Sequence, residues 1–319
     1  MIATAPGKLI ITGEYAVLEG APALVTAIDR RAIARRAGTP RGSSPFLVAV
    51  ADEIAARRGP DDDATRTALA ISVDSTAFYH RITKLGLGSS AAVTVAATAL
   101  ALGTAEKEQV LAVALAAHAR AQGPRGARGS GADIAASVHG GTIVFTRTPS
   151  GPSPCRIERR RWPASVVIVP FFTGAAADTA QLVARVEAAR EADRVMVEAA
   201  LTAIADASRA ACAALAAPPD IATVALIGAI ALAGNAMDRL ALATGLDLVP
   251  ECVTTARSAL ARLGGTAKTT GAGGGDVGIA AIPATVDATV VTRLLIEAGC
   301  QPLRISLDDG GVDLRPDAS

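Results

Sequence analysis

The chain has 319 residues, half of them hydrophobic and 19% charged, which provides a sizeable core and excludes a wholly disordered protein. Its 31 Lys and Arg balance 30 Asp and Glu, and the lack of a basic excess argues against a nucleic-acid-binding protein. The four cysteines and three histidines are scattered without the spacing of a zinc site or a disulfide framework, so we expect a cytoplasmic protein with reduced thiols.

The first half of the chain is expected to alternate strands with alanine-rich helices, because glycine and polar residues separate its apolar segments. The expected strands are 1–11, interrupted by a turn at 5–8, then 23–28 and 142–146, and the expected helices are 91–102, 106–121 and 132–138. Polar loops are predicted at 39–45 and 57–66. A further loop at 123–131 carries Arg125 and Arg128, which fit a substrate contact and a solvated surface equally well.

The second half has the same mixed character. Strands are expected at 165–172, 277–282 and 303–307, and helices at 179–215, 221–244, 252–263 and 286–298. The segment 149–154 is the best candidate for a linker, which predicts two domains at 1–160 and 161–319. Two stretches without charge, 85–105 and 221–237, fit buried helices better than membrane spans. We also expect no signal peptide.

A glycine-rich turn, Lys84-Leu85-Gly86-Leu87-Gly88-Ser89-Ser90-Ala91, precedes the first alanine-rich helix. Glycine lets the backbone approach a ligand closely, and the unpaired N–H groups of the first helical turn attract an anion. A plain serine-capped helix would give the same pattern. The turn also fits the dinucleotide pattern Gly-x-Gly-x-x-Ala, with Glu106 as the ribose-binding acid, although the segment before it is mostly polar.

A second glycine-rich turn, Thr270-Gly271-Ala272-Gly273-Gly274-Gly275-Asp276, precedes a strand in the other half of the chain. So many glycines are costly in chain entropy unless the backbone bends around a ligand or forms a tight turn. Three of the four lysines, Lys8, Lys84 and Lys268, lie beside glycine-rich turns, which favours phosphate chemistry over chance placement on the surface. We therefore expect a ligand in a cleft between the two halves.

Three segments resemble the sequence motifs of the GHMP kinases, which comprise galacto-, homoserine, mevalonate and phosphomevalonate kinases. They are 6–18, with Pro6-Gly7-Lys8-Leu9 and Gly13-Glu14-Tyr15, then 86–91, which resembles the ATP phosphate loop, and 268–276. Within the superfamily, Lys84 and the segments 122–133 and 172–179 are similar to phosphomevalonate kinases, whereas mevalonate kinases usually have His in place of Tyr15.

The resemblance implies an α+β fold of two domains, the first like domain 2 of ribosomal protein S5 and the second ferredoxin-like, with the active site between them. It implies a kinase that uses ATP and Mg²⁺ to convert (R)-5-phosphomevalonate to 5-diphosphomevalonate in isoprenoid biosynthesis. The partners would be small anionic substrates rather than nucleic acid or a membrane, and the chain would be a monomer or a homodimer.

The same resemblance assigns roles to individual residues. Lys8 would stabilise the transferred charge, Asp133 would orient the acceptor, and Ser90 would bind Mg²⁺. The nucleotide would bind to Lys84, Gly86, Leu87, Gly88, Ser89, Ser90 and Ala91. The acceptor would bind to Tyr15, Ser130, Gly131, Arg147, Gly271, Ala272, Gly273 and Gly274. The acidic metal ligand of mevalonate kinases has no match, and the nearby residues are His118 and Gln122.

Several alternatives remain. Inside the superfamily they are a mevalonate kinase and a diphosphomevalonate decarboxylase, a lyase that also consumes ATP. Outside it they are a dinucleotide-binding oxidoreductase and a sensor that binds ATP or a metabolite without chemistry. The presence of both Lys8 and Asp133 argues against the sensor.

Overall fold

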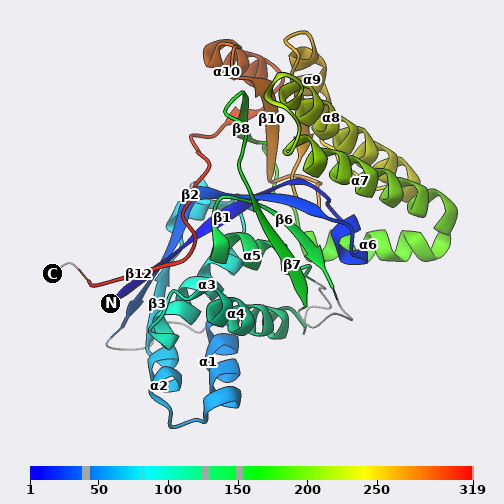
Figure 1. Ribbon diagram of the computed structural model, residues 1–319. Coiled ribbons are helices and arrows are strands. Elements are labelled where there is room, and N and C mark those ends of the chain that lie inside the picture. Colours follow the sequence, from blue (N-terminus) through cyan, green and yellow to red (C-terminus); the bar gives the residue numbers. More distant parts are fainter. Residues whose placement is uncertain (38–43, 81, 124–128, 149–153, 318–319) are drawn as a thin grey trace.

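The computed structural model describes residues 1–37, 44–80, 82–123, 129–148 and 154–317, which form two larger antiparallel sheets covered by helices (Figure 1). The first sheet has the strand order β12-β1-β2-β6-β7, with β3 beside β2. Its strands are β1 (Ile2–Thr12), β2 (Ala23–Arg36), β3 (Ile71–Asp74), β6 (Thr142–Arg147), β7 (Cys155–Arg160) and β12 (Asp313–Arg315). A small hairpin, β4 (Tyr79–His80) and β5 (Thr83–Lys84), leads into the first glycine-rich turn.

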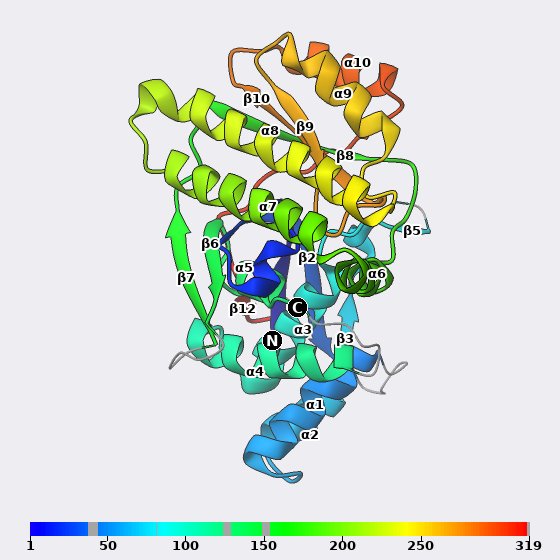
Figure 2. The same cartoon turned by 90° about the vertical axis from the view of Figure 1, so that its right-hand side faces the viewer.

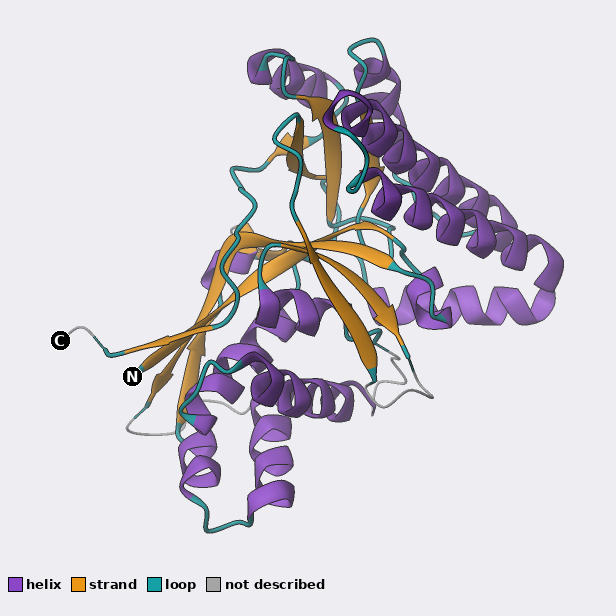
Figure 3. Cartoon of the chain, viewed as in Figure 1, coloured by secondary structure: helices purple, strands orange, loops and turns teal. Residues whose placement is uncertain are grey.

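Helices pack on one face of the first sheet (Figure 3). They are α1 (Pro45–Arg58), α2 (Asp63–Leu69), α3 (Ser89–Leu102), α4 (Lys107–Gln122) and α5 (Ala132–His139). Helix α3 contacts β1, β2 and α5, and nearly all of its small side chains are buried. Because alanine allows close approach, the N-terminus of α3 reaches β1 beside Lys8, where the backbone N–H of Lys8 donates to the carbonyl oxygen of Leu87 (2.9 Å).

The second sheet has the order β11-β8-β10-β9. Its strands are β8 (Val166–Phe172), β9 (Thr266–Thr269), β10 (Val277–Pro283) and β11 (Gln301–Pro302). The helices of this half are α6 (Thr179–Ala192), α7 (Arg194–Ala214), α8 (Pro219–Thr244), α9 (Glu251–Ala261) and α10 (Ala288–Glu297). Helices α7 and α8 lie side by side along their length (Figure 2), while α9 and α10 share a buried core with β8, β9 and β10.

Helix α8 is long and apolar enough to cross a membrane by length and composition alone. Half of its most apolar window is nevertheless buried inside the protein, where the helix packs against α7, β9 and β10. It is therefore a core helix, as the sequence predicted for 221–237.

The two sheets are tied together by the end of the chain and by a shared core. Val277 and Ile279 of β10 belong to the same buried cluster as Leu9 of β1. After β11 the chain returns to the first sheet. Leu307 forms an isolated bridge with Ile28 of β2, and β12 pairs with β1. The division into domains at 1–160 and 161–319 thus remains a proposal, and β12 near the end of the chain pairs with the first sheet.

Some expected elements differ from the structure. The strand predicted at 303–307 is wrong, because this segment crosses between the sheets and pairs only through the bridge at Leu307. The single helix predicted at 179–215 is two helices, α6 and α7, since Asp193 ends the first and accepts the N–H of Met196 (3.2 Å) in the second. Strand β1 also continues through the predicted turn at 5–8, with a shift of register between Pro6 and Gly7.

Other elements were missed. Helix α2 begins inside the polar loop predicted at 57–66, where Asp62 caps it by accepting the N–H of Ala64 (2.8 Å). Elements without a predicted counterpart include α1, β3, β7, β9 and β12. Most of the loops predicted at 39–45, 123–131 and 149–154, including Arg125 and Arg128, lie outside the described residues.

Candidate active site

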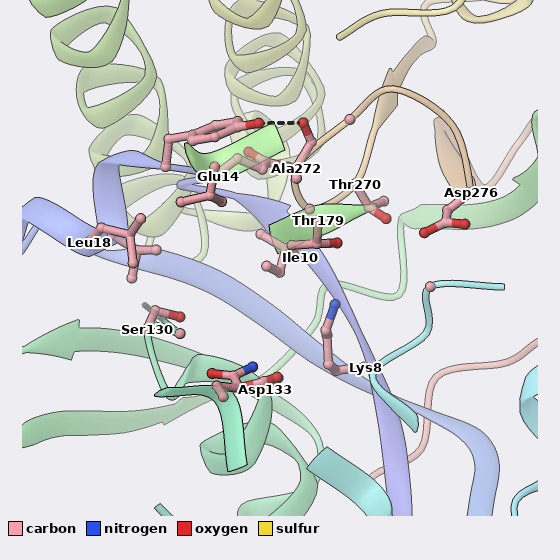
Figure 4. Close-up of a pocket in the computed structure, with 18 residues that line it drawn as sticks. Lys8, Ile10, Glu14, Leu18, Ser130, Asp133, Thr179, Thr270, Ala272 and Asp276 are labelled. Carbon is pink, nitrogen blue, oxygen red and sulfur yellow. Dashed lines mark hydrogen bonds between the residues drawn. The ribbon is translucent and has the colours of Figure 1, made fainter. Parts of the chain in front are cut away.

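A cavity lies between the two halves where both glycine-rich turns arrive (Figure 4). Lys8 of β1, Asp133 of α5 and Gly86 line it from the first half. The turn 270–273 and Thr179 of α6 line it from the second. This central cavity is the cleft that the sequence predicted between the halves.

A second hollow adjoins the central cavity and is formed around the first glycine-rich turn. Lys84, Gly86, Gly88, Ser89 and Ser90 line this phosphate-loop hollow. It shares with the central cavity the residues Lys8, Gly86, Gln122, Gly129, Asp133, Thr179, Val183 and Asp276. The two spaces therefore form one cleft, with an ammonium group and two carboxylates at their junction.

Lys8 is buried, and its ammonium group points into the cleft (Figure 4). Burial lowers the pKa of this ammonium below the usual 10.5, and the nearby carboxylates of Asp133, Asp276 and Glu14 oppose that effect. The group therefore loses its proton more easily than a surface lysine does. Its charge is available to an anion at the junction of the two spaces.

Asp133 lies in the first turn of α5, which begins after Gly131 in the left-handed conformation (φ 88°). Its Oδ1 accepts the N–H of Ile134 (3.0 Å), and a carboxylate is favoured at a helix N-terminus. The same helix is fastened to β1, because the hydroxyl of Ser137 donates to the carbonyl of Pro6 (2.7 Å) in a buried contact. This contact fixes Asp133 relative to Lys8.

The first glycine-rich turn has the geometry of an anion site. Gly86 and Gly88 adopt left-handed conformations (φ 67° and 81°), and no side chain caps the N-terminus of α3. The plain serine-capped helix is therefore excluded, and the first N–H groups of α3 remain available to an anion. A Cβ at Gly88 would lie 3.0 Å from Cγ of Lys8, so a side chain here would force the lysine to shift.

The dinucleotide-binding alternative does not fit the structure. That fold needs a parallel sheet whose strand leads into the glycine turn, whereas both larger sheets here are antiparallel and a two-residue strand precedes Gly86. Glu106 also has another task. It caps α4 by accepting the N–H groups of Glu108 (3.2 Å) and Gln109 (2.8 Å).

The second glycine-rich turn is shaped largely by the protein's own packing. A Cβ at Gly273 would overlap the carbonyl of Leu248, and one at Gly274 or Gly275 would lie 2.8 Å from Leu182 or from the carbonyl of Ala175. The tight-turn explanation thus holds for these three glycines. Gly271 has open space where its Cβ would be, and both Gly271 and Gly273 line the central cavity.

Tyr15 fastens this turn to the first half of the molecule. Its hydroxyl donates to the carbonyl of Ala272 (2.7 Å), and the contact is buried. Burial raises the pKa of the phenol, with a further contribution from Glu14. Tyr15 therefore lines the central cavity as a neutral hydrogen-bonded group that holds the two halves together.

Lys268 does not lie in the cleft. The prediction that the lysines beside glycine-rich turns serve phosphate chemistry is therefore wrong for this residue. It is the third residue of β9 and is fully buried, where its ammonium donates to Glu14 and to the carbonyl of Thr269 (2.6 Å). Sequence reasoning gave Glu14 no role. The structure shows that it lines the central cavity and that its charge acts on Lys8.

Several residues assigned to the acceptor do not line the central cavity. Arg147 lines two neighbouring hollows, and its guanidinium donates to the carbonyl of Leu18 (3.1 Å). Gly131 lines one of those hollows, and Gly274 packs against Leu182. Tyr15, Ser130, Gly271, Ala272 and Gly273 do line the central cavity.

The residues assigned to the nucleotide lie together, but they do not all face the hollow. Lys84, Gly86, Gly88, Ser89 and Ser90 line it. Leu87 and Ala91 are each only 1% exposed and belong to the main core cluster. Their side chains anchor the turn, so that their backbone is what a ligand could contact.

The oxygen atoms in the phosphate-loop hollow fit Mg²⁺. Ser90, Gln122 and Asp276 all line it, and Oε1 of Gln122 is buried without a hydrogen-bond partner among the described residues. Magnesium prefers oxygen ligands, and at nucleotides it takes one or two from the protein and the rest from phosphate and water.

His118 contacts the hydroxyl of Ser90. Its Nε2 lies 3.3 Å from the Ser90 hydroxyl, and its ring stacks on Phe46 with centroids 5.2 Å apart. The cleft as a whole combines an anion-binding turn, a buried ammonium and a carboxylate. That combination suits the transfer of a phosphoryl group between two anions.

Comparison with known sequences agrees with this chemistry. Residues 46–141, which include the first glycine-rich turn and Asp133, match the model of the GHMP kinases N terminal domain. A curated relative, the phosphomevalonate kinase of Streptomyces sp. (strain CL190), is 28% identical over 360 residues, covering 95% of this chain and 96% of that protein.

Comparison with solved structures identifies the fold. Streptococcus pneumoniae phosphomevalonate kinase in complex with phosphomevalonate and AMPPNP is 18% identical, with a TM-score of 0.78 over 96% of this chain and 99% of that one. The mevalonate kinase of L. major in complex with R-mevalonate is also 18% identical, with a TM-score of 0.68 over 99% and 96%. The α+β architecture predicted from the motifs is thereby confirmed.

Proposed function

Because the chain belongs to the GHMP kinase superfamily, we propose that it transfers the γ-phosphoryl group of ATP to (R)-5-phosphomevalonate, giving ADP and 5-diphosphomevalonate. The near full-length relation to a phosphomevalonate kinase supports this acceptor. A cytoplasmic location follows from such a role.

The observation that carries the proposal is that Lys8 and Asp133 line both the central cavity and the phosphate-loop hollow. A kinase needs its donor and acceptor phosphates to meet end to end, with positive charge at the meeting point. In this cleft the meeting point lies beside Lys8. We assign the phosphate-loop hollow to the nucleotide and the central cavity to the acceptor.

In the nucleotide half, the N–H groups at the start of α3 and the lysines Lys8 and Lys84 bind the phosphates. A magnesium ion bound with ATP would offset charge on the phosphate oxygens, and Ser90 and Gln122 are the residues that would hold it, beside Asp276. His118, whose Nε2 lies 3.3 Å from the Ser90 hydroxyl, would help to position that hydroxyl.

In the acceptor half, the chemistry is governed by repulsion between anions. The phosphate of phosphomevalonate is already ionised near neutral pH, so it needs little deprotonation before it attacks. Lys8 offsets the charge that gathers between the two phosphates. Asp133 orients the acceptor and Lys8, and it takes up a proton when the acceptor phosphate still carries one.

The proposed acceptor contacts line the central cavity but not the phosphate-loop hollow. Ser130 and the backbone of Gly271 and Gly273 offer polar groups there. Tyr15 has its hydroxyl committed to Ala272, so we assign it to shaping the cavity. For Arg147 the assignment is weakened, because its guanidinium lies in neighbouring hollows.

A substrate panel tests the proposal. The purified protein is given ATP and Mg²⁺ with phosphomevalonate, mevalonate or diphosphomevalonate, and the release of ADP is followed in a coupled assay. We expect turnover with phosphomevalonate. Turnover with mevalonate alone would identify a mevalonate kinase, whose acceptor group is an alcohol. Release of carbon dioxide from diphosphomevalonate would identify a decarboxylase. ATP binding without turnover of any acid would indicate a sensor.

A further inference from the structure

Asp276 lies in the same hollow as the proposed magnesium ligands Ser90 and Gln122, but no role of its own has been assigned to its charge. It is the last residue of the second glycine-rich turn, and its backbone has a positive φ of 53°, which is uncommon for a residue other than glycine. Its side chain lines both the central cavity and the phosphate-loop hollow. Figure 4 shows its carboxylate on the opposite side of the Lys8 ammonium from Asp133.

Four hydrogen bonds hold Asp276 in this conformation. Its backbone N–H donates to the carbonyl of Ala175 (2.7 Å), and its carbonyl accepts both the N–H (3.0 Å) and the hydroxyl (3.0 Å) of Thr173. Its Oδ1 accepts the N–H of Ala177 (3.2 Å). Its Oδ2 has no hydrogen-bond partner among the described residues and lies against Gly86, where a Cβ would overlap it. A free carboxylate oxygen is thus fixed beside the phosphate loop.

A carboxylate at this place would repel the phosphates of a nucleotide. Burial raises the pKa of Asp276 above its usual value, and the N–H of Ala177 and the nearby charges of Lys8 and Lys84 oppose this rise. The charge of Lys8 is already shared with Asp133 and Glu14, and Lys84 is exposed to solvent. Two anionic groups held this close need a further cation between them. A divalent ion that arrives with the nucleotide would supply it.

We infer that Asp276 is the carboxylate that faces the magnesium ion of bound ATP. The inference rests on the proposed function, since it assumes that the phosphate-loop hollow takes the nucleotide. Ser90 lines the same hollow, so a hydroxyl and a carboxylate are both available there, a donor pair that suits Mg²⁺. Asp276 thereby fills the acidic role that Gln122 cannot.

The substitution Asp276→Asn isolates the charge. An asparagine Oδ1 still accepts the N–H of Ala177, and asparagine tolerates the left-handed conformation. Asp276→Gly also suits this backbone and removes the side chain, which provides a second variant if the first does not fold. Asp178→Asn is the matched control. Asp178 lines the same hollow, but its Oδ1 caps α6 by accepting the N–H groups of Ala180 and Gln181, a task that asparagine also performs.

The test measures the affinity for AMPPNP by calorimetry, once in EDTA and once in excess Mg²⁺. In the wild type we expect Mg²⁺ to tighten binding. In Asp276→Asn we expect tighter binding in EDTA, because a repelling charge is gone, and binding in Mg²⁺ weakened by about tenfold or more, because a metal-facing group is gone. Asp178→Asn should change both affinities in the same direction and keep their ratio.

The two proposals fail in different ways. If Asp276→Asn and Asp276→Gly keep the wild-type ratio between the two affinities, Asp276 does not face the ion, and the kinase assignment stands on the substrate panel. If both affinities rise together, Asp276 acts only as a repelling charge, and the inference is likewise overturned. If the wild type binds no AMPPNP under either condition, the nucleotide site itself is wrong, and the proposed function falls with it.

Discussion

Lys268 of β9 and Glu14, which follows β1, form an ion pair in which both side chains are fully buried. The pair joins the second sheet to the wall of the cleft. Burial raises the pKa of Glu14 and the charge of Lys268 opposes this rise, while Oε2 of Glu14 has no hydrogen-bond partner among the described residues. One carboxylate oxygen is thus satisfied and the other is buried without compensation.

Removing the lysine from this pair should therefore be costly. In Lys268→Met the Glu14 carboxyl loses the cation that satisfies it, and we expect the free energy of unfolding to fall by about 3–5 kcal/mol. Urea denaturation followed by circular dichroism measures this change. The double variant Glu14→Gln, Lys268→Met should recover much of the loss, since no buried charge remains. A double variant as unstable as the single one would show that packing, and not charge, dominates at this site.

The two ends of α3 offer a matched pair of glycines. Gly88 precedes the helix and Gly103 follows it, both in the left-handed conformation (φ 81° and 67°). A Cβ at Gly88 would lie 3.0 Å and 3.2 Å from Cγ and Cε of Lys8, whereas one at Gly103 meets nothing within 4 Å. Alanine at either position should lower stability by about 1 kcal/mol, because both bear the same backbone strain.

Catalysis should separate the two variants. Gly88→Ala displaces Lys8, and we expect kcat to fall roughly tenfold or more, while Gly103→Ala keeps the wild-type kcat. Steady-state kinetics with the acceptor found in the substrate panel, together with melting temperatures, provides the comparison. Equal kcat values for the two variants would mean that the close approach of Gly88 to Lys8 has no catalytic consequence.

The first glycine-rich turn could be predicted from sequence because its information is local. Gly86 and Gly88 specify left-handed backbone, and the alanines after them specify a helix that can lie close to a sheet. The prediction of an anion site needs only the free N–H groups at that helix start. The strands β1 and β2 and the helices α3, α4 and α5 were likewise predicted, whereas α1, α2 and β3 between them were not.

The missed features depend on contacts between distant residues. The burial of Lys268 follows from Glu14, which lies 254 residues away in the sequence, and no local pattern shows this. The same is true of Gly273, whose lack of a side chain is explained by the carbonyl of Leu248. The segment 303–307 alternates apolar and polar residues like a strand, but it crosses between the two sheets and forms only a single bridge. Asp276 belongs to this class, since its partner Gly86 is in the other half of the chain.

Stability should depend on pH through His139 at the end of α5. Its Nε2 is buried without a hydrogen-bond partner among the described residues. Burial lowers the pKa of its imidazole below 6.5, and Lys107 and Arg159 lower it further. Below pH 6.5 the unfolded chain therefore binds a proton more readily than the folded one, so the free energy of unfolding falls as the pH drops toward the folded pKa.

The variant His139→Gln removes this linkage. We compare about pH 7.5 with about pH 5.5, because these values lie on either side of the pKa of a free imidazole. The loss of stability between them should be smaller in the variant than in the wild type. His80→Gln serves as the control, because His80 is exposed in β4. Urea midpoints at the two pH values provide the measurement. An unchanged difference between them in His139→Gln would assign the acid sensitivity to other groups.

Lys8 itself makes the most direct prediction about turnover. Lys8→Met removes the ammonium from the junction of the two spaces, and we expect kcat to fall roughly a hundredfold or more while AMPPNP still binds. Because burial lowers the pKa of Lys8 below 10.5, the free enzyme loses this charge as the pH rises through the lowered value. The kcat/KM of the wild type should then decline on the alkaline side below pH 10.5. Lys8→Arg keeps its charge throughout that range and should lack this decline, whatever its absolute rate. Near-wild-type turnover in Lys8→Met would remove Lys8 from the reaction, and an alkaline decline retained in Lys8→Arg would assign that titration to another group.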